Sequence, residues 1–106
     1  MEREPILHAG PSLADASAAA ILVHGRGGSA EGMLDLARAI GTEGVAWLAP
    51  QARGGSWYPY SFLAAIESNQ PWLSSSLELL DRLVRQCGEA GLAPERVALT
   101  GFSQGA

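Results

Sequence analysis

The sequence predicts an α/β fold in which a mostly parallel sheet carries helices on both faces. Three short runs typical of buried strands alternate along the chain with two stretches of helical periodicity. Strands that are buried on both faces and separated by helices imply a parallel sheet with right-handed crossovers. With 106 residues, the chain forms one domain at most, since domains usually have about 100–200 residues.

The first predicted strand leads through a glycine-rich turn into the first predicted helix. Ala18 to Val23 is a continuous apolar run, as in a strand buried on both faces. Ser29 is the expected N-cap of the following helix, and Gly41 or Gly44 is expected to end it. Before these elements, Ile6 to His8 fits an edge strand.

The second predicted strand, Val45 to Ala49, ends at Pro50 and is followed by a long connection. This connection runs from Gln51 to about Gln70, and its part over 61–67 fits a short helix. Compact domains seldom keep so long a connection without a use for it, so we expect a lid or a binding loop.

The second predicted helix has the clearest periodicity in the chain. Apolar side chains recur on it at steps of three and four residues, at Leu73, Leu77, Leu80, Val84 and Cys87. Gly88 or Gly91 is expected to end this helix, and Pro94 prevents its continuation. Arg96 to Thr100 then forms the third predicted strand.

The composition is that of a folded domain without a nucleic-acid surface. Hydrophobic residues make up 47% of the chain and charged residues 17%, with a net charge of -4. The basic residues are seven scattered arginines, whereas a nucleic-acid partner needs a concentrated basic patch. Cys87 is the only cysteine, so neither an internal disulfide nor a cysteine-based metal site can form.

Neither a signal peptide nor a membrane span is expected. The chain starts with the charged stretch Met1 to Pro5, which has no apolar region behind it. The longest apolar run, Ala18 to Val23, is far too short to cross a bilayer. These features predict a cytoplasmic domain.

The chain closes with a G-x-S-x-G motif, Gly101-Phe102-Ser103-Gln104-Gly105, directly after the third predicted strand. The bare pattern is weak evidence, but a strand in front of it is the context that a nucleophile elbow requires. Such a turn holds the serine in a strained conformation with its hydroxyl clear of the sheet. The two flanking glycines remove side chains that would clash there. The alternative is a glycine-rich turn whose serine caps the next helix.

A serine nucleophile also needs donors for the negative charge that develops on the substrate oxygen. One donor is expected to be the backbone N–H of Gln104, and the other belongs to a loop after an earlier strand. The segment His24 to Gly28 occupies that place, and the backbone N–H of Arg26 is the second expected donor.

Three segments, "ILVHGRGGS", "APQARGGSWYPYSF" and "VALTGFSQGA", resemble the phospholipase/carboxylesterase family of α/β-hydrolases, which includes the acyl-protein thioesterases. The resemblance extends from about Ile21 to Ala106. It implies an α/β-hydrolase fold and the hydrolysis of a small-molecule carboxylic ester or thioester, without metal or cofactor. By the same resemblance, Ser103 is the nucleophile, and Arg26 and Gln104 form the oxyanion hole.

The chain departs from that family after the serine. The family's catalytic acid and histidine follow the nucleophile, whereas only three residues follow Ser103 here. We therefore expect residues 1–106 to be the N-terminal half of a single α/β-hydrolase domain, truncated at the elbow. The partner of this half would be the remaining C-terminal half of the same domain, which would supply the catalytic Asp and His. The non-enzyme alternative is a pseudo-hydrolase or a dimerising fragment whose open sheet edge pairs with another chain.

The aromatic residues of the long connection have two interpretations. Trp57 and Tyr58 can line an acyl pocket, which the resemblance favours, or they can belong to a loop that folds back onto the domain. Cys87 lies on the apolar side of its helix, where core packing is expected.

The glycine-rich turn has two further interpretations. His24 is expected to be a structural histidine, with duty as the general base as the alternative. The stretch from Gly25 to Ala30 also fits the dinucleotide-binding pattern G-x-G-x-x-A. That pattern needs an acidic residue at the end of the second strand, and the stretch from Trp47 to Gln51 has none.

Overall fold

The computed structural model describes residues 6–25, 28–40, 43–52, 57, 69–70 and 72–101. Its elements are β1 (Ile6–Ala9), β2 (Ala18–Val23), α1 (Ala30–Ile40), β3 (Val45–Pro50), α2 (Trp72–Glu89), a 3-10 turn (Pro94–Arg96) and β4 (Val97–Gly101). The short helix predicted over 61–67 lies outside the described residues, as does most of the long connection.

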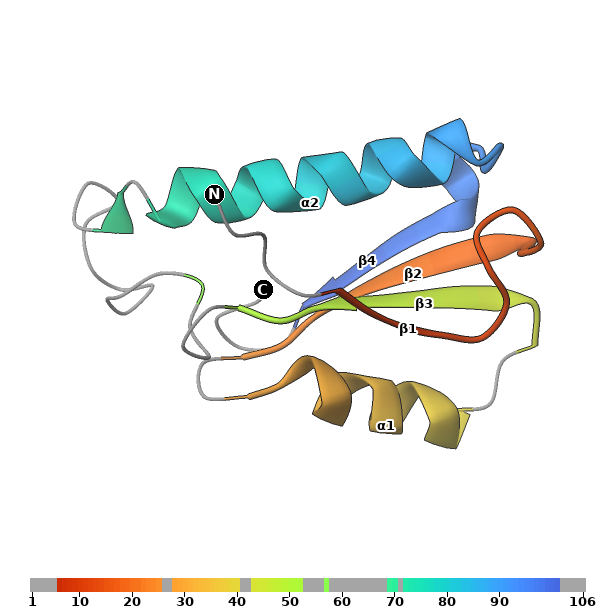
Figure 1. The fold of residues 1–106 in the computed structure, drawn as a ribbon, viewed down its shortest axis with the longest axis horizontal. Coiled ribbons are helices and arrows are strands. Elements are labelled where there is room, and N and C mark those ends of the chain that lie inside the picture. The colour runs from red at the N-terminus through yellow and green to blue at the C-terminus, as the bar shows by residue number, and fades with distance from the viewer. Residues whose placement is uncertain are drawn as a thin grey trace.

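The four strands form one sheet with the order β1-β3-β2-β4. Strand β2 is parallel to both β3 and β4, and β1 pairs with β3 in the antiparallel direction. Helix α1 covers one face of the sheet and α2 the other (Figure 1). The predicted fold class, a mostly parallel sheet between helices, is confirmed, and so is the predicted edge strand at the N-terminus.

Two apolar cores lie on opposite faces of the sheet because side chains alternate along each strand. On β2, Ile21 packs into the core under α2, where it joins Leu83. The next residue, Leu22, packs on the other face and joins Leu34 of α1. Strand β2 is thus buried on both faces, as its continuous apolar sequence predicted, and β3 is largely buried as well. The same prediction is wrong for β4, which is exposed from Ala98 to Gly101 because it lies at an edge of the sheet.

The side chains with which α2 faces the sheet agree only in part with the predicted apolar stripe, of which Cys87 and Leu80 do pack in the core. Leu79, Leu83 and Cys87 are buried, whereas the side chains of Leu77 and Val84 are 58% and 41% exposed. The placement of those two residues on the buried stripe is therefore wrong. The apolar arc of α2 is broad enough to contain two neighbouring rows, and periodicity alone does not say which of them meets the sheet.

The only cysteine of the chain is a core residue, as predicted. The Cys87 side chain is fully buried in the core under α2. Desolvation by burial raises the pKa of this thiol, against the smaller opposite effect of a backbone hydrogen bond. A thiol that stays protonated is a poor nucleophile, so Cys87 contributes packing and not chemistry.

The C-terminal end of α2 is a Schellman motif. The backbone N–H of Leu92 donates to the carbonyl of Cys87 at 3.1 Å, and the N–H of Gly91 donates to that of Gly88 at 3.0 Å. Gly91 has a φ of 99°, in the left-handed region that favours glycine. Of the two glycines that the sequence offered as helix stops, Gly91 is the one that turns the chain.

Alanine at these two glycines is expected to have opposite effects on stability. Gly91→Ala forces a β-carbon into the left-handed region and should lower the free energy of unfolding by about 1–2 kcal/mol. Gly88→Ala places a β-carbon in open space on an exposed helical position and should raise it by about 0.5–1 kcal/mol. Urea denaturation of both variants measures the two signs. Equal effects would contradict the assignment of the helix end.

Among the described strands, β4 forms the edge of the sheet opposite to β1. It pairs with β2 on one side, and its residues from Ala98 to Gly101 are exposed. Leu99 lies opposite Ile21 in the register, and its side chain is 55% exposed. Within the part of the chain that the structure describes, this edge therefore combines free backbone pairing groups with exposed apolar surface. Over the same residues, no helix has the length and apolarity that crossing a bilayer requires.

Candidate active site

The sheet brings together the ends of the two strands that precede the segments predicted to carry the chemistry. Strands β2 and β4 are parallel neighbours, and Val23 at the end of β2 pairs with Gly101 at the end of β4. Neighbouring strands lie about 4.8 Å apart. Gly101, the first residue of the G-x-S-x-G motif, therefore lies beside the last residue of β2, directly before His24. The other predicted site residues, Arg26, Tyr58, Ser103, Gln104 and Gly105, lie outside the described residues.

His24 is held by hydrogen bonds at both of its ring nitrogens. The ring is buried, with 1% of the residue exposed. Its Nδ1–H donates to the carbonyl of Gly25 at 2.7 Å, and its Nε2 accepts from the backbone N–H of Ala52 at 3.0 Å. These partners assign the neutral Nδ1–H tautomer. Because the Nε2 lone pair is engaged, the geometry favours the structural role of His24 over that of a general base.

The turn after His24 closes tightly on the carbonyl of Gly25. That carbonyl also accepts from the backbone N–H of Gly28 at 3.0 Å. A β-carbon on Gly28 would lie 3.1 Å from the Gly25 carbonyl oxygen and 3.4 Å from the His24 β-carbon. The turn therefore favours glycine at position 28, because a β-carbon there would crowd the backbone.

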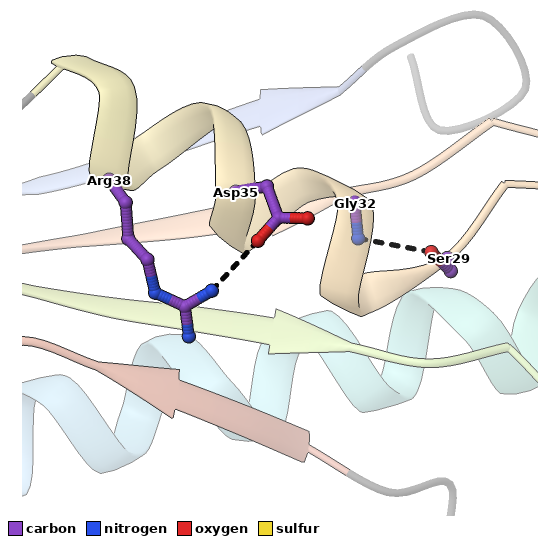
Figure 2. Close-up of polar contacts among 4 residues, drawn as sticks. All are labelled: Ser29, Gly32, Asp35 and Arg38. Carbon is purple, nitrogen blue, oxygen red and sulfur yellow. Dashed lines mark hydrogen bonds and ion pairs between the residues drawn. The ribbon is translucent and has the colours of Figure 1, made fainter.

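Helix α1 begins with the N-cap that the sequence predicted. Ser29 Oγ accepts from the backbone N–H of Gly32 at 3.0 Å, and Asp35 and Arg38 form an exposed ion pair at 2.9 Å along the helix (Figure 2). The cap satisfies one of the N–H groups that a helix start leaves without an intrahelical partner.

A second cap at this helix start comes from the side chain that follows β3. The backbone N–H of Ala30 donates to Oε1 of Gln51, the first residue after β3, at 2.7 Å. A dinucleotide would place its pyrophosphate at this helix start. The chain's own side chain occupies that position, which argues against the dinucleotide-binding alternative.

Alanine at Gly28 and at Gly32 should separate a tight turn from an ordinary helix position. Gly28→Ala is expected to lower the free energy of unfolding by about 1–3 kcal/mol, because backbone atoms must move to admit the new methyl group. At Gly32 the new β-carbon would meet only the Ser29 hydroxyl, at 3.2 Å. Gly32→Ala should be neutral or stabilise by up to about 1 kcal/mol. Thermal and urea unfolding check both values, and a neutral Gly28→Ala would contradict the packing of the turn.

Trp57 connects the glycine-rich turn with α2. It is 6% exposed and lies in the core under that helix. Its indole Nε1–H donates to the carbonyl of His24 at 2.9 Å. The centroids of the Trp57 and His24 rings lie 5.0 Å apart. From the helix, Ser76 Oγ–H donates to the carbonyl of Trp57 at 2.8 Å. The predicted role of Trp57 as a wall of an acyl pocket stays a prediction.

Three residues that hold the glycine-rich turn, the start of α1 and Trp57 were not predicted from the sequence. Gln51 and Ala52 were considered only as the start of a loop, although they follow a parallel strand directly beside the glycine-rich turn. Ser76 is a polar residue on the apolar side of α2, within reach of Trp57. A polar side chain on the apolar side of a helix usually has a hydrogen-bond partner, and this pattern could have indicated the role of Ser76.

A protein-family profile described as Phospholipase/Carboxylesterase matches residues 11–106. The chain belongs to this family. Its members are carboxylic ester hydrolases, which agrees with the resemblance found in the three sequence segments. A search of curated proteins found no match.

Solved structures of related proteins show the same fold. The crystal structure of a phospholipase/carboxylesterase from Dyadobacter fermentans DSM 18053 is 38% identical, with a TM-score of 0.91, over 97% of this chain and 49% of that one. The crystal structure of esterase PE8 is 22% identical, with a TM-score of 0.69, over 95% of this chain and 52% of that one. This chain therefore spans about half the length of the solved phospholipase/carboxylesterase, and its fold matches half of an α/β-hydrolase structure.

Proposed function

We propose that this chain carries the nucleophile and the oxyanion hole of a serine carboxylesterase. The observation that supports this most directly is the pairing of Val23 with Gly101. Gly101 begins the G-x-S-x-G motif and Val23 directly precedes His24, so this pairing supports a site in which the serine and the glycine-rich turn act on the same carbonyl group. Membership of a family of carboxylic ester hydrolases supports the same reaction class.

The proposed reaction proceeds through an acyl-enzyme. Ser103 Oγ attacks the acyl carbon while a histidine takes the hydroxyl proton, and the backbone N–H groups of Arg26 and Gln104 donate to the oxyanion. Collapse of the tetrahedral intermediate breaks the bond to the leaving oxygen or sulfur, which receives that proton. Water then attacks the acyl-enzyme and releases the carboxylic acid. The proposed reaction uses neither a metal nor a cofactor.

We further propose that residues 1–106 are the N-terminal half of one domain and that the remaining half supplies the catalytic Asp and His. The chain spans about half of the related solved structure. The open edge at β4, with exposed Leu99, offers backbone groups that another strand can pair with. Exposed Leu77 and Val84 on α2 add apolar surface that further chain can cover.

The proposal is tested with an extended polypeptide, meaning this chain together with the coding sequence that follows Ala106. A fluorophosphonate should modify this polypeptide once, and mass spectrometry should place the label on the peptide that contains Ser103. Chromogenic esters of increasing acyl length should be hydrolysed, whereas the 106-residue chain alone should be inert. Absence of labelling, or a label on another serine, would remove the esterase assignment.

The second candidate function is that of a non-catalytic interaction fragment. The exposed edge strand β4 favours it, because such edges pair with other chains. In that case the 106-residue chain should form a stable homodimer, which sedimentation measures directly. A monomeric chain whose extended form reacts with the fluorophosphonate would exclude this candidate.

A further inference from the structure

We propose that Trp57 is a positioning residue for the oxyanion hole, tying the glycine-rich turn to helix α2 through its indole N–H. This inference rests on the proposed esterase function. It assigns to Trp57 a role in turnover that differs from that of a pocket wall. The sequence motifs gave no sign of it, because the connection joins a side-chain donor to a backbone carbonyl 33 residues away.

The first link is between Trp57 and the turn. The indole Nε1–H holds the carbonyl of His24 at 2.9 Å, and both residues are buried. His24 in turn holds the carbonyl of Gly25 through Nδ1–H, at 2.7 Å. In a planar trans peptide the N–H that follows a carbonyl points to the opposite side. Donors that fix the carbonyls of His24 and Gly25 therefore also set the direction of the amides that follow them.

The second link is between Trp57 and the helix. Ser76 Oγ–H donates to the Trp57 carbonyl at 2.8 Å. Ser76 lies one turn before Leu79, which is buried against the sheet. The hydroxyl therefore belongs to a firmly packed part of α2. The turn is thus held from two sides, by the segment just after β3 and by α2, and Trp57 is the connection on the α2 side.

The main test is Trp57→Phe in the extended polypeptide, which keeps an aromatic ring and removes the indole N–H. A misdirected oxyanion donor costs transition-state binding and not ground-state binding, so kcat should fall roughly 10- to 100-fold with KM unchanged. The loss should be the same for every acyl length. Trp47→Phe is the matched control, because Trp47 packs on the α1 face of the sheet and should leave both constants unchanged.

The competing role predicts a different pattern. If Trp57 only lines an acyl pocket, Trp57→Phe should change KM in proportion to acyl length and leave kcat for the shortest ester intact. That result would overturn the positioning role. If the parent polypeptide is not labelled by the fluorophosphonate, both the esterase assignment and this inference fail. If it is labelled and Trp57→Phe keeps its kcat, only this inference fails.

Ser76 provides a second variant and a readout that does not use activity. The indole N–H of Trp57, followed by ¹⁵N NMR, should exchange slowly with solvent, and Ser76→Ala should make exchange at least about 10-fold faster by loosening Trp57. Ser76→Thr retains the hydroxyl and should keep both the slow exchange and the kcat of the parent polypeptide. Exchange as fast as that of an exposed indole in the parent protein would overturn the proposal.

Discussion

Replacing Ser103 with alanine in the extended polypeptide is expected to lower kcat by at least about 10,000-fold, because no other group can form the acyl-enzyme. What remains should be the weak catalysis that substrate binding and the oxyanion donors give without a nucleophile. KM should change little, since the hydroxyl contributes mainly to the transition state. Steady-state kinetics with a chromogenic ester, together with the loss of fluorophosphonate labelling, measure the effect.

A second serine of the chain provides the control for this substitution. Ser12 is exposed in the turn before β2, and its hydroxyl donates to Asp15 at 3.1 Å. This turn lies at the opposite end of β2 from the glycine-rich turn, so Ser12→Ala should leave kcat and labelling unchanged. If Ser103→Ala retains kcat while the protein is folded, the elbow is an ordinary helix-capping turn and the esterase mechanism is wrong.

The order and layering of the fold could be predicted from the sequence because they depend on local patterns. The continuous apolar run from Ala18 to Val23 marked a strand buried on both faces, and Gly91 marked the end of α2. The burial of Leu79 in place of Leu77 could not be predicted. Two apolar rows lie side by side on α2, and the packing of the whole helix decides between them.

The candidate site also has a part that the sequence predicts and a part that it does not. The G-x-S-x-G motif and the glycine-rich turn are recognisable because their chemistry requires particular residue types. The support of the turn is not recognisable, since Ala52 contributes only a backbone N–H and any residue except proline supplies one. Ser76 contributes a hydroxyl whose use depends on where Trp57 comes to lie. Such contacts depend on tertiary structure and leave no motif.

Replacing His24 with alanine is expected to lower the free energy of unfolding by about 3–5 kcal/mol, the range seen when a buried aromatic ring is removed. The substitution leaves a cavity beside the Trp57 ring. It also leaves the backbone N–H of Ala52 without its acceptor, and a buried N–H without a partner costs about 1–3 kcal/mol. Since domains have only about 5–15 kcal/mol of stability in total, this is a large fraction.

The other histidine of the chain makes this prediction specific. His8 is exposed on the edge strand β1, so His8→Ala should change stability by no more than about 0.5 kcal/mol. Chemical denaturation of both variants gives the difference, and kcat is measured at a temperature where each variant is folded. If His24 is structural, His24→Ala lowers the free energy of unfolding. Its kcat then falls only because the glycine-rich turn is displaced. If His24→Ala kept full stability and lost turnover, the ring would be acting as the general base instead.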